Sequence, residues 1–231
     1  MKKGEVSNTI YETLKPMLAP SDFRLNKSQV GFVRPIVGGT QTLGVPLWDY
    51  NPKFEFSLTM TFRLDAVEEI TNRFSGSPPK YHSITQTVLT QLEHLGLRNC
   101  RWQAETESDL ELKLSEVGSV VRDAVIPFFQ QHQDLLTIAA AANPAEAHVV
   151  PPAPNRITTG MGILTDRVLF SSGNHPYRAM SAITLACLAH FTNFESLVSR
   201  YQKELSALHL QSERDKFEKL VQFLRAHENA V

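Results

Sequence analysis

Residues 54–64 read FEFSLTMTFRL, and this stretch decides the fold class. Every even position from Phe54 to Leu64 is apolar, and every odd position from Glu55 to Arg63 is polar. Successive side chains of a β-strand point to opposite faces, so the alternation predicts a strand with one buried face and one solvent-exposed face. Such a division is typical of an antiparallel sheet.

Further strands are predicted on both sides of this stretch. Residues 30–37 and 41–48 flank Gly38 and Gly39, which suit the tip of a hairpin. Residues 81–95 satisfy both the helical and the strand period, and their content of Thr and Ser favours a strand. The strands therefore cluster in the first half of the chain.

Most of the remaining chain shows apolar residues at spacings of three and four, which predicts helices. The expected helices are 5–18, 65–74, 115–131 with a kink or a second helix start at Pro127, 134–142, 176–191, 194–208 and 212–227. Asp65 is predicted to cap its helix, with Glu68 in the first turn. Strands and helices that separate along the chain favour the α+β class. We expect an N-terminal helix, an antiparallel sheet of about four to six strands, and a helical C-terminal third packed on one face.

The length of 231 residues suits a single α+β domain over residues 1–231. Residues 143–156 hold four prolines and no periodicity, which indicates a loop or linker. The alternative is therefore a helix-plus-sheet part (1–142), this Pro-rich loop (143–156) and a helical part (157–231).

The charge balance argues against nucleic acid as a partner. The sequence has 23 basic and 24 acidic residues, a net charge of −1, whereas proteins that grip phosphate backbones carry a basic surplus. No apolar stretch follows the N-terminal lysines as in a signal peptide, and the apolar run 135–142 is too short to span a membrane. Cys100 and Cys187 are isolated, which fits a reducing compartment, although one long-range disulfide stays open. We expect a cytoplasmic protein that does not engage membranes.

No catalytic or cofactor motif is present. The sequence has no phosphate-binding loop, dinucleotide-binding glycine pattern, nucleophile elbow or His-Glu-x-x-His motif, and Gly160-Met161-Gly162 is best interpreted as a flexible turn. None of the eight histidines forms a local ligand pair with another histidine or adjoins a cysteine. We expect no cofactor, no metal site and no catalytic residue.

Two segments are candidates for binding a partner. Trp48-Asp49-Tyr50 places two aromatic residues in a turn, where they form a recognition site if exposed and cap the core if buried. Glu105, Glu107 and Asp109, followed by Glu111, would align on one face of a strand. A solvated edge is the preferred interpretation of these acids, and an acidic patch for a basic partner is the alternative.

Two arginines and the cysteines have simpler interpretations. Arg34 and Arg63 lie in predicted strands, where they can bind an anion or, more commonly, brace the sheet. Cys187 lies in an apolar helical stretch and is predicted to be buried. Cys100 has no neighbouring histidine that would make it a nucleophile.

The order of elements resembles a bacterial family of uncharacterised α+β proteins, known as domains of unknown function. The resemblance rests on four short motifs: Leu18–Leu25 after the first helix, Gly31–Arg34, the alternating strand 54–64, and Trp102 before the helix with Ile126–Phe129. Some members of that family, and of families with a similar build, look like immunity proteins for bacterial toxins. The long segment 143–175 departs from the family, which offers no catalytic residues to transfer. The resemblance implies binding without naming a site.

The sequence is compatible with three functional hypotheses. The first is a non-catalytic cytoplasmic protein, of the immunity type, that neutralises a bacterial toxin by direct binding through Trp48, Asp49, Tyr50, Glu105, Glu107 and Asp109. The second is a hydrolase whose site is assembled from scattered His, Arg and acidic residues. A pocket that holds two or more histidines with carboxylates would favour the hydrolase. A scaffold or oligomer subunit with an exposed apolar patch is a third interpretation.

Overall fold

The computed structural model describes residues 1–143, 175–207 and 210–228, which form two compact units. The sheet unit consists of residues 1–62 and 89–133, and the helical unit consists of residues 63–88 together with the described residues from 134 onward. The single domain and its alternative division stay predictions. Residues 144–156 of the expected loop and the expected turn at 160–162 lie outside the described residues.

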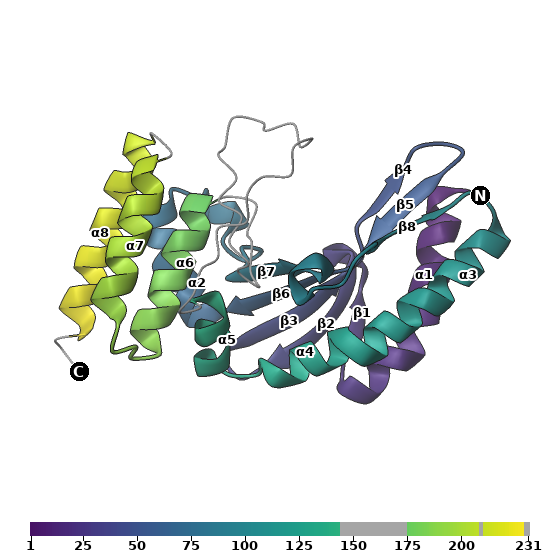
Figure 1. Cartoon of the computed structure of the whole chain (residues 1–231), viewed down its shortest axis with the longest axis horizontal. Helices are drawn as coiled ribbons and strands as arrows, with labels where there is room; N and C mark the ends of the chain where they lie inside the picture. Colours follow the sequence, from purple (N-terminus) through teal and green to yellow (C-terminus); the bar gives the residue numbers. More distant parts are fainter. Residues whose placement is uncertain (144–174, 208–209, 229–231) are drawn as a thin grey trace. The chain divides into compact units, whose positions relative to one another are not determined.

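The larger of two sheets has five strands in the order β1-β2-β3-β6-β7 (Figure 1). The strands are β1 (Arg24–Asn26), β2 (Gly31–Ile36), β3 (Gly39–Gly44), β6 (Thr59–Leu64) and β7 (Val88–Gln91). The strands β2 and β3 form the predicted hairpin, with Gly38 at its tip at a φ of 72°. The last residues of β6 and the first residue of β7 belong to the helical unit.

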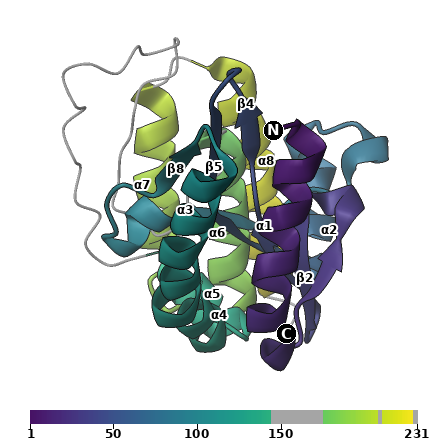
Figure 2. The same ribbon diagram turned by 90° about the vertical axis from the view of Figure 1, so that its right-hand side faces the viewer.

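The smaller sheet consists of β4 (Leu47–Asp49), β5 (Phe54–Ser57) and β8 (Arg101–Ala104). Its order is β4-β5-β8, and both pairs are antiparallel. The three strands lie side by side in Figure 2, with β8 at one edge and β4 at the other. Because both outer strands run antiparallel to β5, they run parallel to each other and end at the same end of the sheet.

The helices of the sheet unit are α1 (Lys3–Leu18), α3 (Glu107–Val120) and α4 (Ile126–Gln131). A π-helical turn, Val121–Val125, joins α3 to α4, and Pro127 lies in the first turn of α4 as predicted. The helix α1 packs against α3 near Gly118, which leaves room for the side chain of Met17. Large apolar side chains from helices and strands fill the core: Ile10, Leu14, Phe32, Leu43, Phe56, Phe62 and Phe129.

The helical unit contains α2 (Asp65–Ser75), α5 (Leu135–Ala142), α6 (His175–Leu188), α7 (Phe194–Ala207) and α8 (Gln211–Glu228). The helix α6 is central, because it packs against the other four helices and its residues Arg178–Cys187 are all buried. Small and apolar residues of α6 make this close packing possible. The predicted α+β class, with an N-terminal helix, an antiparallel sheet and a helical C-terminal third, is confirmed. Among the described residues no helix is long and apolar enough to cross a bilayer.

The stretch 54–64 is extended as predicted, but it serves both sheets. It forms β5, passes Leu58 and continues as β6 in the larger sheet. All its even positions are buried, as predicted. The expectation that every odd position faces solvent is wrong for Glu55 and Thr61, which are 9% and 5% exposed. Side chains of neighbouring strands surround Glu55, and the Thr61 hydroxyl donates a hydrogen bond to the carbonyl of Thr42.

Two local predictions are corrected. Asp65 does not cap α2: Leu64 occupies the N-cap position without a side-chain cap, and the Asp65 carboxylate instead accepts a hydrogen bond of 3.0 Å from Nε of Arg63. In the predicted strand 81–95 only Val88–Gln91 is extended, and Leu92–Leu95 forms a 3₁₀ turn. Both corrections concern short segments where side-chain contacts outweigh local preference.

Replacement of Gly31 tests the close approach of β2 and β3. A Cβ atom at position 31 would lie 2.3 Å from the Leu43 carbonyl oxygen. Gly31→Ala should therefore lower the free energy of unfolding by about 1–3 kcal/mol. The matched control is Gly4→Ala in α1, where nothing lies within 4 Å of the new Cβ, so this change should be neutral or raise stability by up to about 1 kcal/mol. Urea unfolding measures both, and equal effects would contradict the strand geometry.

Candidate functional site

The solvent-facing side of the three-stranded sheet brings together side chains from all three strands. The register pairs Trp48 with Glu55 and Glu55 with Gln103, so these three residues form one row across the sheet. Residues two positions apart on a strand share a face. The same face therefore also carries Tyr50, two positions after Trp48, and Arg101 and Glu105, two positions before and after Gln103. We call the following six residues the outer face: Trp48, Tyr50, Glu55, Arg101, Gln103 and Glu105.

The opposite face of this sheet is packed into the core of the sheet unit. Phe54, Phe56 and Trp102 are buried on it, and the rings of Phe56 and Trp102 stack with their centroids 5.7 Å apart. This apolar layer holds the three strands in place. The outer face is therefore a fixed surface rather than a loose loop.

The carboxylate of Glu55 lies at the centre of the outer face. It accepts hydrogen bonds from Gln103 Nε2 at 2.9 Å and from Arg101 Nη1 at 3.3 Å. The Arg101 guanidinium carbon also lies 5.6 Å from the centroid of the Trp48 ring, within cation–π range. A carboxylate with little exposure needs such partners, because an unpaired buried charge is costly. The outer face is therefore braced across its three strands.

Sequence reasoning missed Glu55, Arg101 and Gln103 as parts of a site. Glu55 is one of the polar positions of the alternating stretch, and Arg101 and Gln103 alternate with buried Trp102 and Ala104. The strand β8 has only four residues, which is too short for a periodicity argument. The alternation of polar and apolar residues from Arg101 to Ala104 was the signal in the sequence that could have indicated this strand.

Trp48 and Asp49 lie in the strand β4 rather than in the predicted turn, and Tyr50 follows directly after it. Trp48 is 37% exposed and Tyr50 is 60% exposed, so this segment does not cap the core. Asp49 alternates onto the opposite side of β4, and its carboxylate accepts a hydrogen bond of 3.1 Å from the Asn51 backbone. Only the two aromatic residues of this segment belong to the outer face.

The prediction that four acidic residues after Trp102 align on one strand is wrong, because β8 ends at Ala104 and α3 begins at Glu107. Thr106 caps the helix, and the Asp109 carboxylate accepts hydrogen bonds from the backbone N–H groups of Thr106 and Glu105, at 3.0 and 3.3 Å. Hydrogen bonding with the Thr106 side chain, then with these two N–H groups, lowers the pKa of Asp109. Asp109 therefore serves the helix start, whereas Glu105 and Glu107 are exposed beside it.

The two predicted segments nevertheless meet at one end of the sheet. The strands β4 and β8 both end there, and the register places Glu105 in the row of Lys53 and Tyr50. Neighbouring strands lie about 5 Å apart, so Tyr50 and Glu105 are separated by roughly 10 Å across the sheet. This end combines the exposed ring of Tyr50 with the exposed acids Glu105 and Glu107, and Lys53 lies between Tyr50 and Glu105 in the row.

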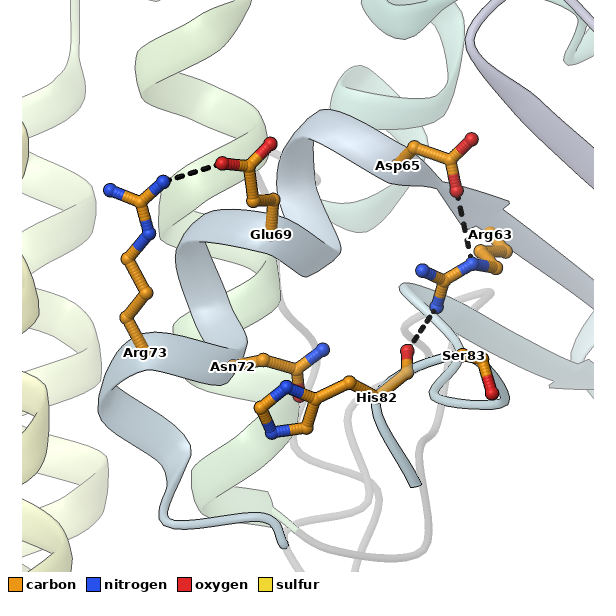
Figure 3. A pocket seen from close by; sticks show the side chains of 7 residues that line it. All are labelled: Arg63, Asp65, Glu69, Asn72, Arg73, His82 and Ser83. Carbon is orange, nitrogen blue, oxygen red and sulfur yellow. Dashed lines mark hydrogen bonds and ion pairs between the residues drawn. The ribbon is translucent and has the colours of Figure 1, made fainter. Parts of the chain in front are cut away.

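The helical unit has a separate pocket beside α2, with a volume of about 530 Å³. Figure 3 shows its lining: Arg63, Asp65, Glu69, Asn72, Arg73, His82 and Ser83. Arg63 donates to Asp65, as noted, and its Nη1 donates to the carbonyls of His82 and Thr85, at 3.0 and 2.8 Å. Arg63 thus fastens the segment after α2 to the start of the helix, which favours the bracing interpretation.

The helix α2 also carries a buried polar network centred on Glu68, which is 0% exposed. One carboxylate oxygen accepts from the Thr87 hydroxyl at 2.9 Å, and the other accepts from the Tyr177 hydroxyl at 2.6 Å. Nη1 of Arg63 lies 3.9 Å from the second oxygen. Burial, followed by the charge of Glu68, raises the pKa of Tyr177 above its usual range, so the hydroxyl stays a donor. The network joins α2 to α6.

The pocket does not meet the condition set for a hydrolase. Among the described residues of its lining, His82 is the one histidine, and its Nε2 donates to the Ser77 carbonyl at 2.7 Å. The two carboxylates, Asp65 and Glu69, are each paired with an arginine. Within the described ranges no group of three or more His, Cys, Asp or Glu side chains is placed to hold a metal ion. The described residues thus give the hydrolase hypothesis no support.

Arg34 and the cysteines also have structural roles. Arg34 bonds to the Gln41 side chain and to the carbonyls of Ser21 and Phe129, and burial lowers its pKa. Burial, followed by the nearby charge of Glu93, raises the pKa of Cys100 to about 11, so this thiol is a poor nucleophile. Cys187 is buried in α6 as predicted, and neither cysteine takes part in a disulfide bond.

Comparison of the chain with protein-family models, curated proteins and solved structures gave no match. The resemblance to a family of uncharacterised α+β proteins therefore stays a prediction. The geometry of the outer face is the basis for a functional proposal.

The Glu68 network predicts the effect of removing one hydroxyl. Tyr177→Phe leaves a buried carboxylate oxygen without its closest donor, which should lower the free energy of unfolding by about 1–3 kcal/mol. Tyr81→Phe is the matched control, because Tyr81 is 46% exposed and water replaces any lost bond. Denaturant unfolding of both variants measures the difference. Equal stability of the two variants would contradict the buried network.

Proposed function

We propose that the chain is a non-catalytic binding protein that holds a protein partner on the outer face of its three-stranded sheet. The observation that carries the proposal is the pair of exposed aromatic residues, Trp48 and Tyr50, on a braced β-sheet. Tryptophan, tyrosine and arginine dominate the binding energy of protein interfaces. Trp48 is held against Arg101, so little conformational entropy is lost when a partner covers it.

The acidic end of the sheet supports a partner with a basic surface. Glu105 and Glu107 are exposed next to the row of Tyr50, and Asp109 is engaged in the helix cap. Opposite charges at the rim of an interface accelerate association and make it sensitive to salt. Glu105 and Glu107 therefore raise the rate at which a basic partner associates, whereas Trp48 and Tyr50 provide most of the binding energy.

The finer form of the proposal is a cytoplasmic immunity-type protein that neutralises a bacterial toxin by covering it. Three features support it: the resemblance described above, an acidic and aromatic surface, and two cysteines outside any disulfide, which suit a reducing compartment. A basic toxin domain, such as one that acts on nucleic acid, has the charge that this surface complements.

Capture of the partner followed by mutation of the aromatic pair tests the proposal. The tagged chain is used to capture proteins from lysate of its own organism, and a stoichiometric partner is identified by mass spectrometry. Trp48→Ala with Tyr50→Ala should then weaken binding by about 30-fold or more, the change expected for hot-spot residues. Tyr81→Ala, an exposed aromatic residue of the helical unit, is the control and should leave affinity unchanged.

A second measurement separates steering from affinity. Glu105→Arg with Glu107→Arg should slow association and reduce its dependence on salt, with a smaller effect on dissociation. If both double variants bind as tightly and as fast as the unchanged chain, the outer face is not the binding surface. A captured partner that proves to be a toxin would support the immunity role, and a partner of another kind would refute it.

A further inference from the structure

The outer edge of β8 is an unpaired strand edge. The strand pairs with β5 on one side, and within the described ranges no strand pairs with its other side. Arg101 and Gln103 are both exposed on it. Unpaired edges are templates for another strand, and natural proteins either block them or use them.

The hydrogen-bond pattern of the small sheet shows which backbone groups point outward. The N–H of Tyr50 bonds to the carbonyl of Lys53 at 2.8 Å, and the N–H of Ser57 bonds to that of Pro46 at 3.2 Å. Hydrogen-bonded pairs alternate along an antiparallel ladder. The backbone N–H and carbonyl groups of the odd-numbered residues of β5 therefore point toward β4, and those of its even-numbered residues point toward β8.

The same alternation continues into β8. The even residues of β5, Phe54 and Phe56, are paired with Ala104 and Trp102, whose backbone groups therefore face β5. The N–H and carbonyl groups of Arg101 and Gln103 consequently point away from the sheet. Among the described residues these groups make no other backbone hydrogen bond outside the ladder, so a further strand can pair with them.

We propose that β8 pairs with β8 of a second copy of this chain, antiparallel and centred on Gln103. In that register Gln103 faces Gln103 of the second copy, and Arg101 faces Glu105 of the second copy. The contact between Arg101 and Glu105 occurs twice because of the two-fold symmetry, as expected for a closed dimer. The result is a continuous six-stranded sheet that carries two outer faces.

The charges of the edge favour this register over its alternatives. Opposite charges directly across a strand pair stabilise it, and like charges oppose it. A parallel pairing in register would place Arg101 against Arg101 and Glu105 against Glu105. The antiparallel pairing centred on Gln103 places opposite charges together at both ends. The charges of β8 therefore favour the antiparallel orientation over the parallel one.

The side chains and backbone at the edge have capacity for these contacts. The Arg101 side chain is 57% exposed although it contacts Glu55, and Glu105 is exposed. The N–H of Glu105 bonds to Asp109 in the helix cap, whereas no hydrogen bond of its carbonyl is part of that cap. The pairing thus forms about four backbone hydrogen bonds and two ion pairs. Because the edge is short, the dimer should be weak and depend on concentration.

Charge reversal on the full chain tests the proposal by sedimentation equilibrium over a concentration series at low salt. The unchanged chain should dimerise. Arg101→Glu alone and Glu105→Arg alone should each weaken dimerisation by roughly tenfold or more, because each change creates two like-charge pairs. An equimolar mixture of the two variants should dimerise again, since both ion pairs re-form between unlike copies.

The mixture also separates loss of pairing from loss of folding, because misfolded variants would not restore each other. Glu111→Arg, an exposed change on α3 away from the edge, should leave dimerisation unchanged. An unchanged chain that stays monomeric up to about 1 mM, or variants that fail to recover on mixing, would overturn the proposal. Neither result depends on the proposed protein partner.

Discussion

The outer face depends on the carboxylate of Glu55. This group lies on the middle strand of the three-stranded sheet with little exposure, so it must be paired within the protein. Both of its partners, Arg101 and Gln103, come from β8, more than forty residues later in the chain. Satisfying Glu55 therefore fixes β8 beside β5 and places the Arg101 guanidinium near the Trp48 ring. One buried charge thus organises the aromatic, basic and polar side chains that can meet a partner.

The helical unit uses the same principle for a different purpose. Glu68 is buried and paired, but its partners Thr87 and Tyr177 bind the helices together rather than orienting an exposed aromatic residue. Arg63 is engaged in holding the segment after α2. The two buried carboxylates therefore have different roles. Glu68 stabilises the packing of α2 and α6, whereas Glu55 stabilises the outer face. This difference is the reason that the outer face, and not the pocket beside α2, carries the functional proposal.

Local periodicity was sufficient to predict the fold class and the helices of the C-terminal third, because amphipathic helices record their buried side in the sequence. It could not show that the stretch 54–64 changes sheets at Leu58, since the alternation continues without a break. The acids after Trp102 satisfied a strand pattern, but the cap formed by Thr106 and Asp109 turned the segment into a helix. The aromatic pair could be proposed from the sequence, whereas its exposure and its contact with Arg101 depend on long-range strand pairing, which no local pattern contains.

The strand β8 pairs with β5, and within the described part of the chain its other edge has no partner strand. Residue-resolved amide hydrogen exchange by NMR, on a dilute sample, tests this arrangement most directly. The account predicts alternation: the amides of Trp102 and Ala104 exchange slowly because they bond to β5, and those of Arg101 and Gln103 exchange fast because they face solvent. Equally slow exchange at all four positions would show that the chain covers this edge itself. Equally fast exchange would show that β8 is not part of the sheet, and either result would contradict the account.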